Sequence, residues 1–439
     1  MSFRQLVTIV GITVLGIATA YMAQIPVVFG FSAGLLALIL ISFRSGIRGK
    51  ELGAGIWEGV RRTKEVVWLL LLVGMILPCW AVSGTVDELV RWALAVVQPQ
   101  YALTFSFLIC ASVSMILGTS TGTLSAVGVP LIGMAIHVGV PLPYVAGAVV
   151  SGIFVGDRTS PFSSAHQLIA ASTETSIPRQ WRAMAPTSAL AVLASLAFYG
   201  WLDLRTAKGP VEQSASLIPS DLGESLVLLI PIFVLLGSIV LRLKTKYGCL
   251  LSIAAAIIVG SLQKGVGPAA WLKAMWSGAE HSIVEGKGLL SMVSLVSLIM
   301  LAGAFNGILE RSNLIGAYIE RMMGEMPSLA SATWRTGAFG LVLCLISCTQ
   351  TLPIIMSGRN ILPLWNRRFS SAHLSRVIAD TSAVLAAAVP WNLLAVLCST
   401  FVGVPVEQYL PFAIFLWSLP LCTYLYSAYL DRAKVSVKA

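Results

Sequence analysis

Two short segments rich in hydroxyl groups and glycine interrupt a long apolar stretch at residues 118–164. The first, residues 118–123, has the sequence GTSTGT. The second, residues 156–161, has the sequence GDRTSP and places Asp157 and Arg158 shortly before a proline, which has no N–H to donate. In lipid, backbone groups freed from a helix must be packed in protein or line a wet cavity. Paired breaks of this kind are typical of transporter binding sites, although small residues also allow membrane helices to pack closely.

Oxygen atoms from two distant parts of the chain are the candidate ligands of a transported cation, because hard monovalent cations bind carboxylates, hydroxyls, amide oxygens and free carbonyls. The candidates are Thr119, Ser120, Thr121, Thr123, Asp157, Ser160 and Ser163 in the first half, and Thr349, Gln350, Thr351, Asp380, Thr381 and Asn392 in the second. Asp157 and Asp380 are the only acidic members of this set. A carboxylate removed from water binds a proton more readily, so Na+ and H+ would compete for Asp157 and its nearby hydroxyls, which suffices for antiport.

Arg158 leaves two interpretations open. It either neutralises Asp157, or its side chain reaches the membrane surface and leaves Asp157 free. Arg158, His166 and Arg359 together suggest a different chemistry, the binding of an organic carboxylate, because arginine offers a two-pronged fork of donors and helix N-termini favour negative charge. A purely local polar contact is the alternative for His166.

The composition predicts a protein that crosses the membrane many times. Of the 439 residues, 57% are hydrophobic and 11% are charged, and the mean hydropathy is +0.86. We expect an all-α fold with about ten to twelve transmembrane helices, arranged as two inverted repeats with broken helices or re-entrant hairpins. The seven cysteines lie scattered in apolar sequence, and we expect small core residues rather than disulfides or metal ligands.

The net charge of +10 indicates membrane orientation rather than binding to nucleic acid. Basic residues cluster at 44–64, at 242–246 and in the last eight residues, and the positive-inside rule then places both termini in the cytoplasm of a prokaryotic cell. The chain has no phosphate-binding loop, which argues against ATP drive. It shows no nucleophile–base pair, so we expect neither an enzyme nor a cofactor other than the transported Na+ and H+.

The order of segments predicts six parts: an N-terminal helix pair at 1–52, a first transport repeat at 53–202, a polar linker at 203–223, a helix pair at 224–271, a second transport repeat at 272–400, and a C-terminal helix with a basic tail at 401–439. Within the first repeat, residues 53–64 and 87–97 are expected to lie along the membrane surface.

Three features of the first repeat return in the second at a nearly constant offset. Trp57 is echoed by Trp276 (276 minus 57 is 219), and the TGT of residues 121–123 by the TQT of 349–351, at an offset of 228. The PFS of residues 161–163 is echoed by the PWN of 390–392, at an offset of 229. The repetition indicates an internal duplication, and transporters commonly bind their substrate where such repeats meet.

Taken together, the motifs of both halves resemble the NhaC family of sodium/proton antiporters. They are GTSxGT at 118–123, SGxxxGDRxSP at 151–161, QTL at 350–352, LSRxxxD at 374–380 and VPWN at 389–392. The resemblance covers roughly residues 57–420 and implies inverted repeats with re-entrant hairpins. It also implies ion-coupled transport, with some members of the wider superfamily exchanging carboxylates or carrying amino acids. Where the family pattern is SPLSDTT, this chain has SPFSSAH at 160–166, so one candidate cation ligand is lost.

We therefore predict a secondary transporter of the cytoplasmic membrane, with Na+/H+ antiport as its cycle. The alternative is a Na+- or H+-coupled carrier of a small carboxylate or amino acid. A passive channel lined by the same hydroxyls is a further reading, and uphill transport would distinguish it. The partners expected are a small ion or organic solute and the lipid bilayer; assembly into a homo-oligomer stays open.

Overall fold

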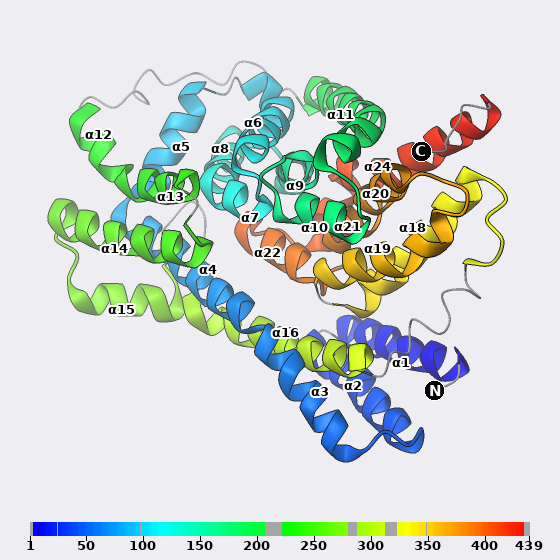
Figure 1. Ribbon diagram of the computed structural model, residues 1–439. Coiled ribbons are helices and arrows are strands. Elements are labelled where there is room, and N and C mark those ends of the chain that lie inside the picture. The colour runs from blue at the N-terminus through cyan, green and yellow to red at the C-terminus, as the bar shows by residue number, and fades with distance from the viewer. Residues whose placement is uncertain are drawn as a thin grey trace.

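The computed structural model describes residues 3–23, 25–96, 99–206, 222–241, 243–279, 288–311, 323–347 and 349–433, and its regular elements in these ranges are helices (Figure 1). Six of these helices are long and apolar enough to cross a membrane, or eight if each of two bent pairs is one span. This is fewer than the ten to twelve crossings expected. The reason is length: four further apolar helical stretches, Val7–Ala20, Ala102–Leu117, Ser120–Ile136 and Ile230–Val240, have only 10–17 residues, whereas about 20 are needed to span the hydrocarbon core.

Within its described residues, the N-terminal part consists of five helices, and the first two pack against each other as a pair. Its elements are α1 (Phe3–Met22), α2 (Val27–Arg44), α3 (Gly49–Arg62), α4 (Lys64–Ser83) and α5 (Thr85–Val96). Helix α3 packs along α16 (Gly288–Arg311); in Figure 1, α3 is blue and α16 is yellow-green. Glycines permit this approach: a Cβ on Gly59 would lie 2.0 Å from the carbonyl oxygen of Gly303.

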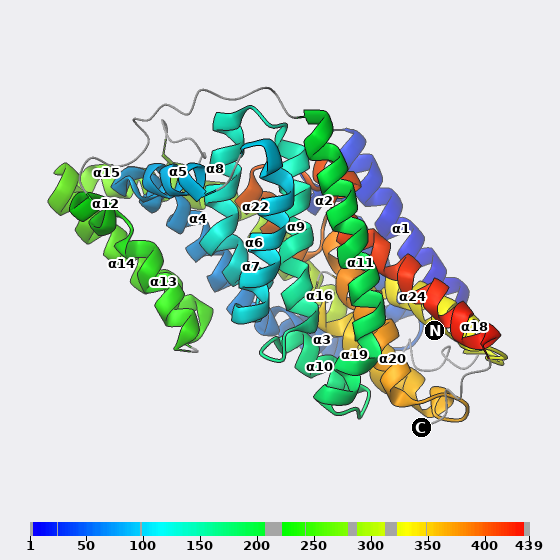
Figure 2. The same cartoon turned by 90° about the horizontal axis from the view of Figure 1, so that it is seen from above.

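The centre of the molecule is a bundle from the first half (Figure 2). Its elements are η1 (Pro99–Tyr101), α6 (Ala102–Leu117), α7 (Ser120–Thr123), the π-helical turn η2 (Leu124–Gly128), α8 (Val129–Val138), α9 (Leu142–Thr159), α10 (Ser164–Ser172) and α11 (Ile177–Thr206). Helices α6 and α9 pack at very short range. A Cβ on Gly156 of α9 would lie 2.0 Å from the carbonyl carbon of Ser114, and the Ser114 hydroxyl accepts a hydrogen bond from the Gly156 N–H at 2.9 Å.

The remaining helices flank this bundle. On one side lie α12 (Leu222–Leu228), α13 (Ile230–Val240), α14 (Thr245–Lys264) and α15 (Pro268–Ser277), and α13 and α14 form the expected pair. The other elements are α18 (Leu329–Ile346), α19 (Thr351–Trp365), α20 (Ser371–Asp380), α21 (Ser382–Leu385), η4 (Ala386–Ala388), α22 (Leu393–Val402), α23 (Val406–Tyr409), η5 (Leu410–Phe412) and α24 (Ile414–Arg432).

The first break of the first half is shorter than expected, and the second begins later in the chain. The first is only Gly118, in the left-handed region at φ 68°, and the extended Thr119; the chain is helical again from Ser120. Helix α9 continues through Asp157 and Arg158, and the second break covers residues 160–163. The reason is that Gly156 serves close packing against α6 rather than a turn. Helix α11 extends to Thr206, the fourth residue of the segment 203–223 predicted as a linker; residues 207–221 lie outside the described ranges.

Matching helix caps occur in the two halves. The Asp203 carboxylate, in the last turn of α11, accepts hydrogen bonds from the first amides of α6, Leu103 N and Thr104 N. The Asp431 carboxylate, at the end of α24, accepts them from Leu329 N and Ala330 N at the start of α18. The offsets are 226 (329 minus 103) and 228 (431 minus 203), close to those of the sequence motifs. The caps agree with a duplication; the inverted arrangement and the domain boundaries stay predictions.

The six described cysteines are free, and five of them are buried. They behave as the small core residues that the sequence predicts. Cys348 lies outside the described residues.

Candidate functional site

A buried carboxylate lies where the two halves of the chain meet. Asp157, in the last turn of α9, is 7% exposed. Its Oδ1 accepts a hydrogen bond from the backbone N–H of Ser120 at 3.2 Å, and its Oδ2 lies 3.4 Å from the donor Nε2 of Gln350. The same Gln350 amide donates to the carbonyl of Ala383 at 2.7 Å. The starts of α7 and α19 thus converge on Asp157, and a helix start favours a negative charge.

The hydroxyls of the first half form hydrogen bonds mainly with the backbone around the two breaks. The Thr119 hydroxyl accepts from Gly122 N at 2.9 Å and caps α7, while Thr123 donates to the Thr119 carbonyl at 2.8 Å. The Ser163 hydroxyl donates to the Asp157 carbonyl and caps α10. A hydroxyl has one donor and two acceptor positions. Ser163 uses both acceptor positions, since Ala165 N and His166 N donate to it at 3.2 and 3.3 Å.

Two other hydroxyls of the predicted set differ in their surroundings. Ser160 donates to the Met115 carbonyl at 2.8 Å, which ties the second break to α6. The Thr121 hydroxyl lies 3.3 Å from that of Thr119, and either atom could be the donor. The hydroxyls of Thr119 and Thr121 therefore form one small group at the first break.

From the second half, Gln350 donates a side-chain hydrogen bond to Asp157. The Thr349 carbonyl accepts from the Ser347 hydroxyl at 2.8 Å, and Thr351 is exposed at the start of α19. Thr381 donates to the Val377 carbonyl at 2.6 Å. Asn392 caps α22 and donates to the Ser347 carbonyl at 3.3 Å. Thr381 and Asn392 thus have local backbone partners rather than Asp157.

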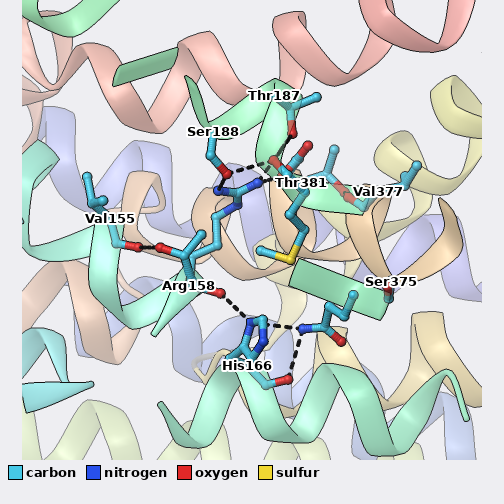
Figure 3. A network of polar contacts seen from close by, with 12 residues as sticks. Val155, Arg158, His166, Thr187, Ser188, Ser375, Val377 and Thr381 are labelled. Carbon is cyan, nitrogen blue, oxygen red and sulfur yellow. Dashed lines mark hydrogen bonds and ion pairs between the residues drawn. The ribbon is translucent and has the colours of Figure 1, made fainter. Parts of the chain in front are cut away.

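Arg158 does not neutralise Asp157 and does not reach the membrane surface. It is 1% exposed and forms an ion pair with Asp380 of α20, which is 0% exposed. Its Nη1 donates to the Ser188 hydroxyl at 2.8 Å, and its Nη2 to Thr187 at 3.4 Å (Figure 3). Successive residues of a helix do not face the same side, so Arg158 points away from its neighbour. Asp380 is therefore already engaged and is not a second free cation ligand.

The predicted group of Arg158, His166 and Arg359 is not assembled as an anion site. His166 is buried, with Nδ1 2.8 Å from the Arg158 carbonyl and 3.0 Å from the Gln180 amide (Figure 3). Since a carbonyl only accepts, Nδ1 donates to it, and His166 makes the local polar contact foreseen as the alternative. Arg359 is exposed on α19, and Ser164, where the family pattern has an acid, is exposed at the start of α10.

Sequence reasoning missed Arg376 as a candidate. It is fully buried on α20, and its Nη2 donates to the Ser427 hydroxyl at 2.7 Å. Its spacing to Asp380, four residues on a helix, was a usable signal that both side chains share one face.

The helical fold, its candidate spans and a buried carboxylate between two interrupted segments define a multi-pass membrane transporter. The family model described as "Na+/H+ antiporter family" matches residues 152–429, and the chain belongs to this family. It is 27% identical to the Na+/H+ antiporter NhaC of Bacillus subtilis over 423 residues, covering 89% of this chain and 90% of that protein.

Other relatives carry names for organic solutes. The chain is 26% identical to the arginine/ornithine antiporter ArcD of Halobacterium salinarum over 424 residues, covering 92% of this chain and 85% of ArcD. It is 23% identical to the malate-2H+/Na+-lactate antiporter of Bacillus subtilis over 409 residues, covering 89% and 86%. A solved structure of MtrF of Neisseria gonorrhoeae, whose title describes a class of antimetabolite efflux pumps, aligns with a TM-score of 0.40 and 14% identity, over 82% of this chain and 80% of MtrF.

Proposed function

We propose that this chain exchanges Na+ for H+ across the cytoplasmic membrane of a prokaryote, with the Asp157 carboxylate as the group that both ions use. Membership of the Na+/H+ antiporter family supports the exchange, and relatives named NhaC match nearly the whole chain. The observation that carries the role of Asp157 is its position. It is a buried carboxylate with no basic partner among the described side chains, at the contact between α7, α9 and the start of α19.

The chemistry follows from the charge of one group. Ionised Asp157 binds Na+, and protonated Asp157 does not, so each ion excludes the other from the same carboxylate. The co-ligands we propose are the oxygens of Thr119 and Ser120 from one half and the amide oxygen of Gln350 from the other. Gln350 now directs its nitrogen at Asp157, and a turn of the amide would present its oxygen to Na+.

The ion pair between Arg158 and Asp380 leaves the Asp157 carboxylate free for Na+ and H+. A guanidinium beside Asp157 would occupy the carboxylate permanently and exclude both Na+ and H+. Asp380 holds the Arg158 side chain away from the Asp157 carboxylate, and Thr187 and Ser188 accept further hydrogen bonds from it. We infer that Asp380 acts as the counter-ion of Arg158 rather than as a ligand of the transported ion. No cofactor is required in this cycle.

The test is uphill transport by the purified full chain in liposomes. With an inward Na+ gradient and a pH-sensitive dye inside, an antiporter exports H+ as Na+ enters and therefore alkalises the lumen. An outward Na+ gradient should acidify it. A passive channel only dissipates gradients. Absence of any Na+-dependent pH change, in vesicles where the protein is shown to be folded and inserted, would contradict the proposal.

A further inference from the structure

Helix α3 lies at the edge of the molecule (Figure 1), and its outer side carries a stripe of basic residues. This basic stripe consists of the exposed side chains of Lys50, Trp57, Arg61 and Lys64, and Trp57 is 70% exposed. Each follows the one before by seven, four or three positions, so they share one face of the helix. The opposite face packs on α16 through Gly59, and the basic stripe therefore points away from the protein.

The three acidic residues between positions 50 and 65 lie off the stripe. Glu58 forms ion pairs with Arg62 at 2.7 Å and with Arg311 at 3.7 Å. Glu65 pairs with a lysine of α14 at 2.9 Å, and Glu51 lines a cavity beside Arg311 on the α16 side. In the part of the chain that the structure describes, no ion pair joins a base of the stripe to an acid. The positive charge of the stripe is therefore open to a partner outside the chain.

The connectivity of α3 places it at a membrane surface. It joins α2 and α4, and both of these helices are long and apolar enough to cross a membrane. A segment between two such spans begins and ends on the same side of the bilayer. Trp68, one turn into α4, is 51% exposed, and tryptophan beside basic residues is typical of the level of the lipid headgroups. Because charges are costly in the hydrocarbon core, the basic stripe faces the headgroup region.

The groups of the stripe match phosphate-bearing headgroups. Phosphodiester oxygens accept hydrogen bonds from guanidinium and ammonium groups. The indole of Trp57 combines an apolar body with one N–H donor, which suits the boundary between headgroups and acyl chains. From Lys50 to Lys64 the stripe extends over about 21 Å, at 1.5 Å per residue, which leaves room for more than one headgroup. A headgroup with net negative charge fits better than a zwitterionic one, whose ammonium group the stripe repels.

We propose that the basic stripe of α3 binds the headgroups of anionic phospholipids, with Lys50, Arg61 and Lys64 on the phosphates and Trp57 at the acyl-chain boundary. The site is separate from Asp157 and does not depend on Na+/H+ exchange. Phosphatidylglycerol is the probe, and phosphatidylcholine is the matched lipid without net charge. Inorganic phosphate tests whether phosphate alone occupies the stripe.

The experiment measures thermal unfolding of the purified full chain in a non-ionic detergent, at constant Na+ concentration, while each of the three probes is added. A ligand of the folded state raises the unfolding temperature. We expect phosphatidylglycerol to raise it more than phosphatidylcholine, and inorganic phosphate to leave it unchanged. Added choline chloride should reduce the effect of phosphatidylglycerol, because salt screens exposed charges. Equal effects of the two lipids, or an equal effect of inorganic phosphate, would overturn the proposal.

A variant that removes the three charges locates the site. The triple variant is Lys50→Gln, Arg61→Gln and Lys64→Gln. It should raise the phosphatidylglycerol concentration that gives half of the stabilisation on the order of 100-fold, since each charge contributes about fivefold, or about 1 kcal/mol, at an anionic surface. If the triple variant does not fold, the single variant Arg61→Gln decides, and it should give a shift of about fivefold. An unchanged half-maximal concentration in the folded variant would refute the site.

A second triple variant controls for net charge. It removes three exposed bases that lie elsewhere, in Lys273→Gln, Arg367→Gln and Arg432→Gln. Because it lowers the net charge by the same three units, it should respond to phosphatidylglycerol as the wild type does. An equal loss in both triple variants would show that the lipid responds to overall charge and not to α3, and would contradict the assignment.

Discussion

Arg158 and Asp380 form a buried ion pair, and their burial determines how much stability the fold should lose when one partner is neutralised. Asp380→Asn keeps the side-chain shape but leaves the Arg158 charge with only the neutral Thr187 and Ser188 hydroxyls. Both partners are at most 1% exposed, so the relevant cost is that of a broken buried pair, about 3–5 kcal/mol, rather than that of a surface pair. Arg158→Gln should cost a similar amount, because it leaves the Asp380 carboxylate unpaired.

The double variant Arg158→Gln with Asp380→Asn separates the pair from other effects. It removes both charges, so we expect it to be more stable than either single variant, with a coupling energy of at least ~2 kcal/mol. The assay is thermal and denaturant unfolding of the four proteins in one detergent. Glu58→Gln is the control, since the Glu58–Arg62 pair is exposed and should contribute little. If the losses of the two single variants simply add in the double variant, the pair does not stabilise the fold as described.

Two further predictions concern packing and the site itself. Gly156→Ala should lower the unfolding temperature markedly, although alanine has the higher helix propensity, because the new Cβ would lie 2.0 Å from the Ser114 backbone. Gly237→Ala is the control, since its new Cβ would have nothing within 4 Å. It should leave the unfolding temperature unchanged or raise it in the same thermal scan. Gln350→Ala should raise the KM for Na+ between about twofold and about tenfold, the effect of about 0.5–1.5 kcal/mol for one hydrogen bond, with exchange retained. Unchanged KM in the liposome assay would remove Gln350 from the ion site.

The sequence predicts where many helices lie, but it predicts few of the contacts between residues that are distant in the chain. The apolar runs at 6–23, 66–82, 101–117 and 248–262 predict α1, α4, α6 and α14 to within a few residues, because hydropathy and length are local properties. The start of the second break was misplaced, because nothing in the sequence distinguishes a glycine that turns the chain from Gly156, which admits the backbone of Ser114.

The candidate site shows the same division. The polar segment at 156–161 led to the prediction that Asp157 is a functional carboxylate. The similarity between TGT at 121–123 and TQT at 349–351 made Gln350 a candidate. The partner of Arg158 was not predictable, since Asp380 is 222 positions away and the sequence offered Asp157 as the neighbouring acid. Arg376 was overlooked because its buried, partly unpaired state depends on the packing of α20 against α24, which no local pattern encodes.

The most direct test of the proposed exchange is proton release from purified protein when Na+ is added. In weakly buffered solution, Na+ binding to protonated Asp157 should release up to about one proton per chain, since both ions use the same carboxylate. Asp157→Asn should release none, while its unfolding temperature in Na+-free buffer stays close to that of the wild type and Na+-driven pH change in liposomes is lost. If Asp157→Asn still releases protons on Na+ addition and exchanges the two ions normally, another group carries the coupling, and the assignment of Asp157 is wrong.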